Sequence, residues 1–132
     1  MTGIHTGRYG KEYNITLTDI IRRILIETEN VRIRISSIEI TEVSDDLIQL
    51  MKENDRMTKF LHIPLQSGCD SVLKRMHRPY DTEEYYAKIE KIRKEIPGVS
   101  ISTDLITGFP QESEQEFLET YEFLKKCHFS FL

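Results

Sequence analysis

Cysteine is scarce in this sequence: only Cys69 and Cys127 occur among 132 residues, and they lie far apart. That spacing matches no metal-binding or redox motif, and it favours a reduced, cytoplasmic protein. The histidines do not form a metal-binding set by spacing either; they are His5, His62, His77 and His128. The sequence therefore predicts no metal site of its own.

Long apolar runs are also missing. No stretch approaches the roughly 18 residues that a membrane-spanning helix needs, and no signal peptide is visible at the start. The formal net charge of −4 gives no support for a nucleic-acid-binding patch within this segment. A chain that is 39% hydrophobic and 30% charged has the composition of an ordinary globular domain.

What the sequence does contain is an alternation of apolar runs and amphipathic segments. Four runs have the character of strands, at residues 31–40, 60–66, 99–109 and 129–132. Helical patterns occupy residues 16–29, 44–54, 70–76, 81–96 and 113–126. This order predicts an α/β fold of parallel βα units, either an open doubly wound sheet or a (βα) barrel.

The ends of the helices and of the chain carry separate signals. Ser44 and Ser113 are expected N-caps, and Glu116 completes a capping box with Ser113. Pro97 and Gly98 are expected to end the helix before them. The chain opens on a glycine-rich turn and closes on an apolar run, so we expect residues 1–132 to be a fragment of a larger protein.

Polar residues gather where the predicted strands end, and both α/β architectures bind ligands at this edge. Asp104 stands out, because an acid flanked by Ile101, Leu105 and Ile106 needs a partner. The other candidates are Glu39, Gln66, Ser67, Gly68, Arg78 and the glycines Gly3, Gly7 and Gly10. Each also has a purely structural interpretation, as a solvated acid, a turn residue, a loop hydrogen bond or a surface charge. The residues alone predict only a small polar ligand at one strand edge.

Longer motifs add a family resemblance. LHIPLQSGCDSVLKRMHRPY (residues 61–80), followed by ISTDLITGFPQESEQEF (101–117), resembles the radical S-adenosylmethionine (radical SAM) methylthiotransferases. TGIHTGRYG (2–10) and RIRISSIEITEVSDDLI (32–48) resemble the same family, so the likeness runs nearly from end to end. It is strongest to the branch that modifies threonylcarbamoyladenosine (t6A) in tRNA.

The resemblance implies part of a radical SAM core, an incomplete (βα) barrel or partial TIM barrel, without the family's N-terminal methylthiotransferase domain and C-terminal TRAM domain. It implies a parent enzyme that uses SAM and 4Fe-4S clusters to install a methylthio group on a modified adenosine of tRNA. The family's cluster motif, C-x3-C-x2-C, is absent from this sequence. Neither Cys69 nor Cys127 can replace it, so we expect the isolated fragment to be inactive.

The resemblance also implies SAM-binding roles for seven residues: Gly3, Gly7, Glu39, Gln66, Ser67, Arg78 and Asp104. The backbone of Gly3 and Gly7 would meet the methionine amino group of SAM, and Gln66 and Ser67 would line the SAM pocket. Arg78 is suited to pair with the methionine carboxylate through two bonds. Asp104 would accept a hydrogen bond from the ribose, and Glu39 would bond the ribose or the amino group.

Several alternatives remain open at this point. The substrate could be isopentenyladenosine in tRNA or a ribosomal-protein aspartate, as in the other branches, or the chain could be a non-catalytic α/β binding module. An ordinary barrel lyase or aldolase would need a Schiff-base lysine inside a strand, and none of the predicted strands has one. An incomplete barrel leaves strand edges and apolar surface uncovered, so self-association of the fragment is a further hypothesis.

Overall fold

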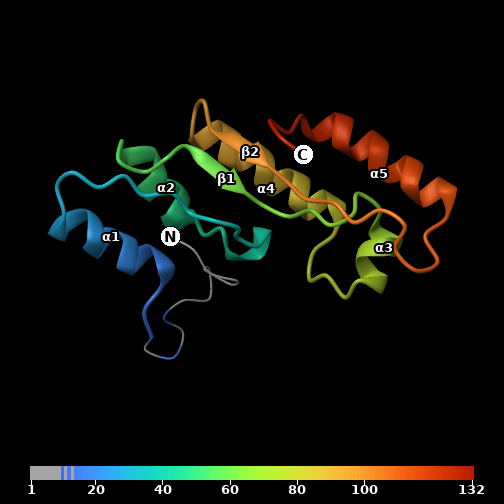
Figure 1. The fold of residues 1–132 in the computed structure, drawn as a ribbon, viewed down its shortest axis with the longest axis horizontal. Coiled ribbons are helices and arrows are strands. Elements are labelled where there is room, and N and C mark those ends of the chain that lie inside the picture. Colours follow the sequence, from blue (N-terminus) through green and yellow to red (C-terminus); the bar gives the residue numbers. More distant parts are fainter. Residues whose placement is uncertain (1–9, 11, 13) are drawn as a thin grey trace.

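The structure is a computed structural model, and it describes residues 10, 12 and 14–132. In this part of the chain, α-helices alternate with short strands (Figure 1). The elements are α1 (Leu17–Glu27), η3 (Ile40–Glu42), α2 (Asp45–Glu53), β1 (Phe60–His62), α3 (Asp70–Arg75), α4 (Thr82–Glu95), β2 (Ser100–Ser102) and α5 (Glu114–Cys127).

The strand pairing is parallel throughout the described residues. β1 pairs with β2, with His62 opposite Ser102. Isolated parallel bridges extend the same row on both sides, from Ser37 to His62 and from Ser102 to Phe131. Four segments of the chain therefore run side by side in one direction, which confirms the predicted parallel α/β fold.

The strands are much shorter than the sequence pattern predicts. Residues 31–40 form only single bridges, at Ile33 and Ser37, and the segment ends in the 3-10 helix η3. The final segment forms a single bridge at Phe131. The placement of Asp104 inside a strand is wrong, because β2 ends at Ser102. An apolar run indicates that side chains are buried, whereas a strand also needs repeated backbone pairing. In residues 31–40 and in the final segment this pairing is limited to single bridges.

The helix ends agree with the predicted signals. The hydroxyl of Ser44 accepts a hydrogen bond from a backbone amide in the first turn of α2. Ser113 and Glu116 exchange the two bonds of a capping box at the start of α5. After α4, Gly98 turns the chain with a φ of 77°, a conformation that favours glycine. Local chemistry thus fixes where these helices start and stop.

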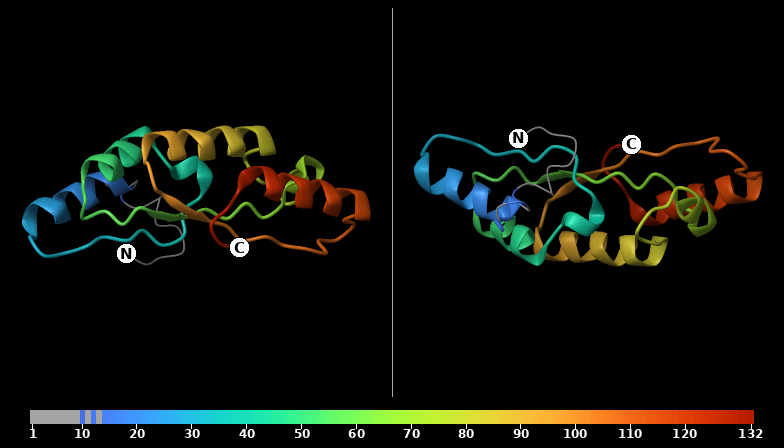
Figure 2. Two further views of the ribbon diagram at one scale, coloured as in Figure 1. Left: turned by 90° about the horizontal axis from the view of Figure 1, so that it is seen from above. Right: turned by 90° about the horizontal axis from the view of Figure 1, so that it is seen from below.

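The helices α2, α4 and α5 lie on one side of the strands (Figure 2). Side chains alternate along each strand, so Leu61, Ile63 and Ile101 are buried in the same core as the apolar stripe of α4. His62 and Asp104 belong to the opposite face, over which no described helix lies. This open face is where polar side chains can meet a ligand.

Helix α5 is held against the turn that follows β1. The Thr120 hydroxyl accepts a hydrogen bond from the Gly68 amide at 3.1 Å. A Cβ atom added to Gly68 would lie 2.9 Å from both Phe123 and Thr120, so only glycine permits this approach. Among the described residues, no helix is both long and apolar enough to cross a membrane.

Candidate functional site

The carboxyl edge of the sheet carries three of the predicted site residues. Ser37, His62 and Ser102 lie opposite one another across the parallel row. Beyond this row, each segment continues in the same direction and reaches Glu39, Gln66 and Asp104 respectively. Because parallel strands end at a common edge, these residues share one side of the fold, as the sequence predicts.

Glu39 and Arg78 form an ion pair at this edge. Helix α3 ends where His77 takes a left-handed φ of 55°, and this turn leads directly into Arg78. The Arg78 Nη1 atom lies 3.4 Å from Glu39 Oε1, and both side chains are about one quarter exposed (27% and 25%). Within the described residues, Arg78 Nε is buried without a hydrogen-bond partner. The guanidinium therefore retains donor capacity beyond the carboxylate that it contacts.

Gln66 and Asp104 are joined through the backbone. The Gln66 amide donates to the Asp104 carbonyl at 2.9 Å, and the Ile106 amide donates to the Gln66 carbonyl at 2.9 Å. Gln66 has a φ of 71°, which is uncommon for a residue with a Cβ atom. Strained backbone of this kind is concentrated at ligand sites, so Gln66 is a reasonable position for a contact.

Asp104 has a side-chain partner, His62, although the predicted reason for one, enclosure by apolar neighbours, is wrong. The Nε2 atom of His62 lies 3.0 Å from Asp104 Oδ2. The acid is not buried, however: its side chain is 65% exposed, because alternation places it on the open face while Ile101 faces the helices. The spacing of the histidines predicts no metal-binding role for His62, and no pattern in the sequence predicts its contact with Asp104. Strand alternation places His62 opposite Ser102 and near Asp104 only once the register of β1 and β2 is known, and the sequence leaves that register undetermined.

Ser67 differs from the other predicted residues at this edge. Its side chain is buried; its hydroxyl lies 3.2 Å from that of Thr120 and accepts a hydrogen bond from the Cys69 amide. The hydroxyl is therefore used in docking α5, and a ligand contact by Ser67 stays a prediction. Gly3 and Gly7 lie outside the described residues. No contact in the described part of the chain joins the Glu39–Arg78 pair to the His62–Asp104 pair.

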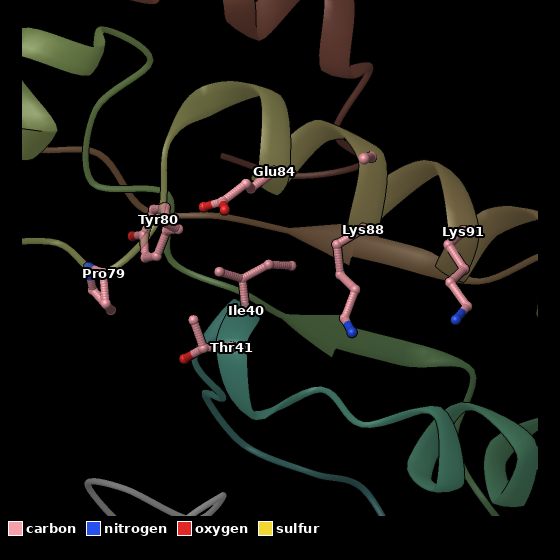
Figure 3. Close-up of a pocket in the computed structure, with 8 residues that line it drawn as sticks. Ile40, Thr41, Pro79, Tyr80, Glu84, Lys88 and Lys91 are labelled. Carbon is pink, nitrogen blue, oxygen red and sulfur yellow. The ribbon is translucent and has the colours of Figure 1, made fainter.

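A pocket of about 450 Å³ lies between η3 and α4 (Figure 3). Its lining residues are Ile40, Thr41, Pro79, Tyr80, Glu84, Ala87, Lys88 and Lys91. Lys88 and Lys91 extend from α4 on the side of the pocket, and Lys91 Nζ lies 2.6 Å from Asp45 Oδ1 at the start of α2. The pocket starts at the residues that follow Glu39 and Arg78 in the chain, but it contains none of the predicted SAM-binding residues. It is a separate, neighbouring feature of the same edge.

The two cysteines are unsuited to hold an iron–sulfur cluster. Cys69 contacts Glu119 at 2.9 Å, and burial, with this hydrogen bond, raises the pKa of its thiol. Burial raises the pKa of Cys127 to about 11. Cluster ligands are thiolates, which a raised pKa disfavours. The described residues also contain no group of three or more potential metal ligands. No chemical step is therefore assigned to a cluster held by this chain.

Comparison with known proteins gives the family. Residues 10–124 match the radical SAM superfamily. The chain belongs to the radical SAM superfamily. This agrees with the parallel βα order and with the ligand edge described above. Members of this superfamily use SAM and a 4Fe-4S cluster.

This radical SAM chain is similar over nearly its whole length to three longer proteins. It is 44% identical over 134 residues to the threonylcarbamoyladenosine tRNA methylthiotransferase MtaB of Bacillus subtilis, covering 98% of the chain and 29% of that relative. It is 38% identical over 130 residues to MtaB of Thermotoga maritima, covering 98% and 30%. The tRNA-2-methylthio-N(6)-dimethylallyladenosine synthase of Finegoldia magna is 36% identical over 128 residues, covering 96% and 28%. The chain thus spans less than one third of the length of these relatives.

The edge has the chemical character that SAM requires. The Arg78 side chain is about one quarter exposed, and its guanidinium keeps donors that Glu39 does not engage, which suits a carboxylate. Asp104 presents an exposed carboxylate suited to ribose hydroxyls. Both belong to the radical SAM match. Asp104 follows the carboxyl end of β2, where barrel enzymes bind their ligands, whereas Arg78 follows helix α3 and reaches this edge through its ion pair with Glu39. The residues present therefore fit SAM, although they do not fit the cluster.

Proposed function

We propose that this chain supplies a SAM-binding edge in a radical SAM methylthiotransferase that acts on a modified adenosine of tRNA in the cytoplasm. One observation carries this proposal. The carboxyl edge carries a carboxylate, a guanidinium and a strand end with a left-handed φ, in a chain that is 44% identical to MtaB of Bacillus subtilis. The t6A branch is favoured because, over nearly the whole chain, the two MtaB proteins are 44% and 38% identical to it, against 36% for the dimethylallyladenosine synthase of Finegoldia magna.

Each side chain has a defined task in this proposal. Arg78 donates to the methionine carboxylate, using donors that Glu39 does not occupy. Glu39 accepts from the amino group or the ribose, and it limits the positions that the Arg78 side chain can take. Asp104 accepts from a ribose hydroxyl. When bound, SAM and the cluster supply the radical chemistry, while these residues orient the ligand at the edge of the barrel.

The cluster ligands must come from chain that precedes this segment if the proposal is right. A C-x3-C-x2-C loop encoded upstream of residue 1 supports the enzyme. If the gene encodes no such loop, a non-catalytic binding module is the better interpretation. The isolated chain is expected to be inactive for the same reason. Self-association of the chain also stays a prediction, and a monomer in light scattering would contradict it.

The substrate is tested by nucleoside analysis of tRNA from a strain that lacks the gene. We expect the methylthio form of t6A to disappear, with t6A itself retained, and to return on complementation. Loss of the methylthio form of isopentenyladenosine would place the protein in the dimethylallyladenosine branch. If both tRNA modifications persist and a ribosomal-protein aspartate loses its methylthio group, the tRNA proposal is wrong.

A further inference from the structure

A polar chain of three side chains crosses the open face of the sheet. His62 lies between two residues of the neighbouring segment, with Nδ1 2.8 Å from the Ser102 hydroxyl and Nε2 3.0 Å from Asp104 Oδ2. The exposed fraction increases along these three residues, from 6% for Ser102 to 24% for the His62 side chain and 65% for the Asp104 side chain. The imidazole therefore links a buried anchor to an exposed carboxylate.

The partners determine the direction of each hydrogen bond. An ionised carboxylate can only accept, so His62 Nε2 carries the hydrogen and donates to Asp104. In the neutral imidazole Nδ1 is then the acceptor, and the Ser102 hydroxyl donates to it. This arrangement engages Oδ2 of Asp104. Within the described residues Oδ1 has no partner, so it remains available to accept from a ligand hydroxyl.

Sheet stability does not explain this chain of bonds. The same two segments are already joined by backbone bonds, from the Ile63 amide to the Ser102 carbonyl and from the Gln66 amide to the Asp104 carbonyl, both at 2.9 Å. A hydrogen bond to a carboxylate this exposed adds little to folding stability. Its clear effect is to restrict the rotamers of Asp104, which would otherwise be free in solvent.

We propose that His62 is a positioning residue that holds the Asp104 carboxylate in place for a ribose hydroxyl of SAM, with Ser102 fixing the imidazole. This inference rests on the proposed function, because it needs Asp104 as the ribose acceptor. A carboxylate that is already oriented loses less conformational freedom when the ligand binds. His62 therefore raises SAM affinity without touching SAM.

The test is calorimetric titration of SAM onto the full-length protein that contains this chain, with its cluster reconstituted. His62→Gln and His62→Asn form a matched pair. The Gln amide nitrogen extends about as far as Nε2 and can still donate to Asp104, whereas the shorter Asn amide reaches only the Ser102 side. Asp104→Ala and the double variant His62→Asn with Asp104→Ala complete a double-mutant cycle. Thermal unfolding of every variant confirms that it is folded.

We expect Asp104→Ala to weaken SAM binding roughly 5- to 150-fold, as for a lost charged hydrogen bond. His62→Asn should weaken it about three- to tenfold, and His62→Gln should bind within about twofold of wild type. In the Asp104→Ala background, His62→Asn should have no further effect. If His62→Asn weakens binding by the same factor in both backgrounds, or if Gln is as poor as Asn, His62 does not act through Asp104 and the inference is wrong. If Asp104→Ala binds SAM like wild type, the proposed site itself fails, and this result is distinct from the other two.

If His62→Asn does not fold, Ser102→Ala replaces it. That variant removes the donor to Nδ1 and leaves the imidazole in place. It should weaken SAM binding in the wild-type background and have no effect when Asp104 is alanine. Equal weakening in both backgrounds would overturn the inference in the same way.

Discussion

Thr103→Val tests how the two central segments are joined beyond the short strands. The Thr103 side chain is buried, and its hydroxyl accepts from the Leu65 amide at 2.8 Å while donating to the Ile63 carbonyl at 2.9 Å. It thus replaces a missing backbone bond of the sheet. Valine has nearly the same shape but provides neither a donor nor an acceptor. The Leu65 amide would then be buried without a partner.

The expected cost follows from these contacts. An unsatisfied buried amide costs about 1–3 kcal/mol, and loss of the bond to Ile63 adds about 0.5–1.5 kcal/mol. The Ile63 carbonyl also accepts from the Tyr85 hydroxyl at 2.6 Å, so it keeps one bond in the variant. We therefore expect Thr103→Val to lower the free energy of unfolding by about 2–4 kcal/mol.

Tyr85→Phe is the matched control, because it removes the other donor to the Ile63 carbonyl but leaves no buried amide without a hydrogen-bond partner. It should cost only about 0.5–1.5 kcal/mol. Urea denaturation followed by far-ultraviolet circular dichroism measures both values on the 132-residue chain. If Thr103→Val costs less than about 1 kcal/mol, or no more than Tyr85→Phe, the Thr103 hydroxyl does not replace the backbone bond as argued.

Three further predictions concern the packing of α5 and the ionisable groups near it. Gly68→Ala should lower the free energy of unfolding by about 1–3 kcal/mol, because the new methyl group would meet the α5 backbone; unchanged urea midpoints would contradict this. At pH 8, Cys69 and Cys127 should react with a thiol reagent far more slowly in the folded protein than in urea, because burial raises both pKa values; equal rates would be inconsistent with their burial. The hydrogen bond from Arg75 holds the pKa of Glu116 well below its usual value of 4.5, so the pair stabilises the fold above that pH and its contribution is lost as the pH falls. The stability difference between wild type and Glu116→Gln should therefore be larger at pH 7 than at pH 3, and an equal difference at both would refute this.

The helices and the parallel order were predictable because their signals are local. Ser44, Ser113 and Gly98 act within one turn of the chain, so the sequence near them is sufficient to define where the helices start and stop. The length of the strands was not predictable in the same way. Residues 31–40 bury their apolar side chains without continuous backbone pairing, and an apolar run cannot distinguish these two states.

The sequence predicts which edge of the sheet carries the candidate residues, but it does not predict which of these residues contact each other. Strand ends locate Glu39, Gln66 and Asp104, since parallel segments finish on one side of a sheet. The contacts of Arg78 with Glu39 and of His62 with Asp104 span about 40 positions of sequence (39 and 42). Such contacts depend on the exact register between strands, which composition and periodicity leave undetermined. The buried hydroxyl of Ser67 is a similar case, because only the position of α5 decides its partner.

We propose that SAM binds at the carboxyl edge of this chain through Asp104 and Arg78. The most direct test is calorimetric titration of SAM onto the reconstituted full-length protein, comparing wild type with Asp104→Ala and Arg78→Ala. Each variant should bind SAM less tightly by about 1–3 kcal/mol, or roughly 5- to 150-fold, because each loses one charged hydrogen bond. If both variants bind SAM as tightly as wild type, the site does not lie at this edge.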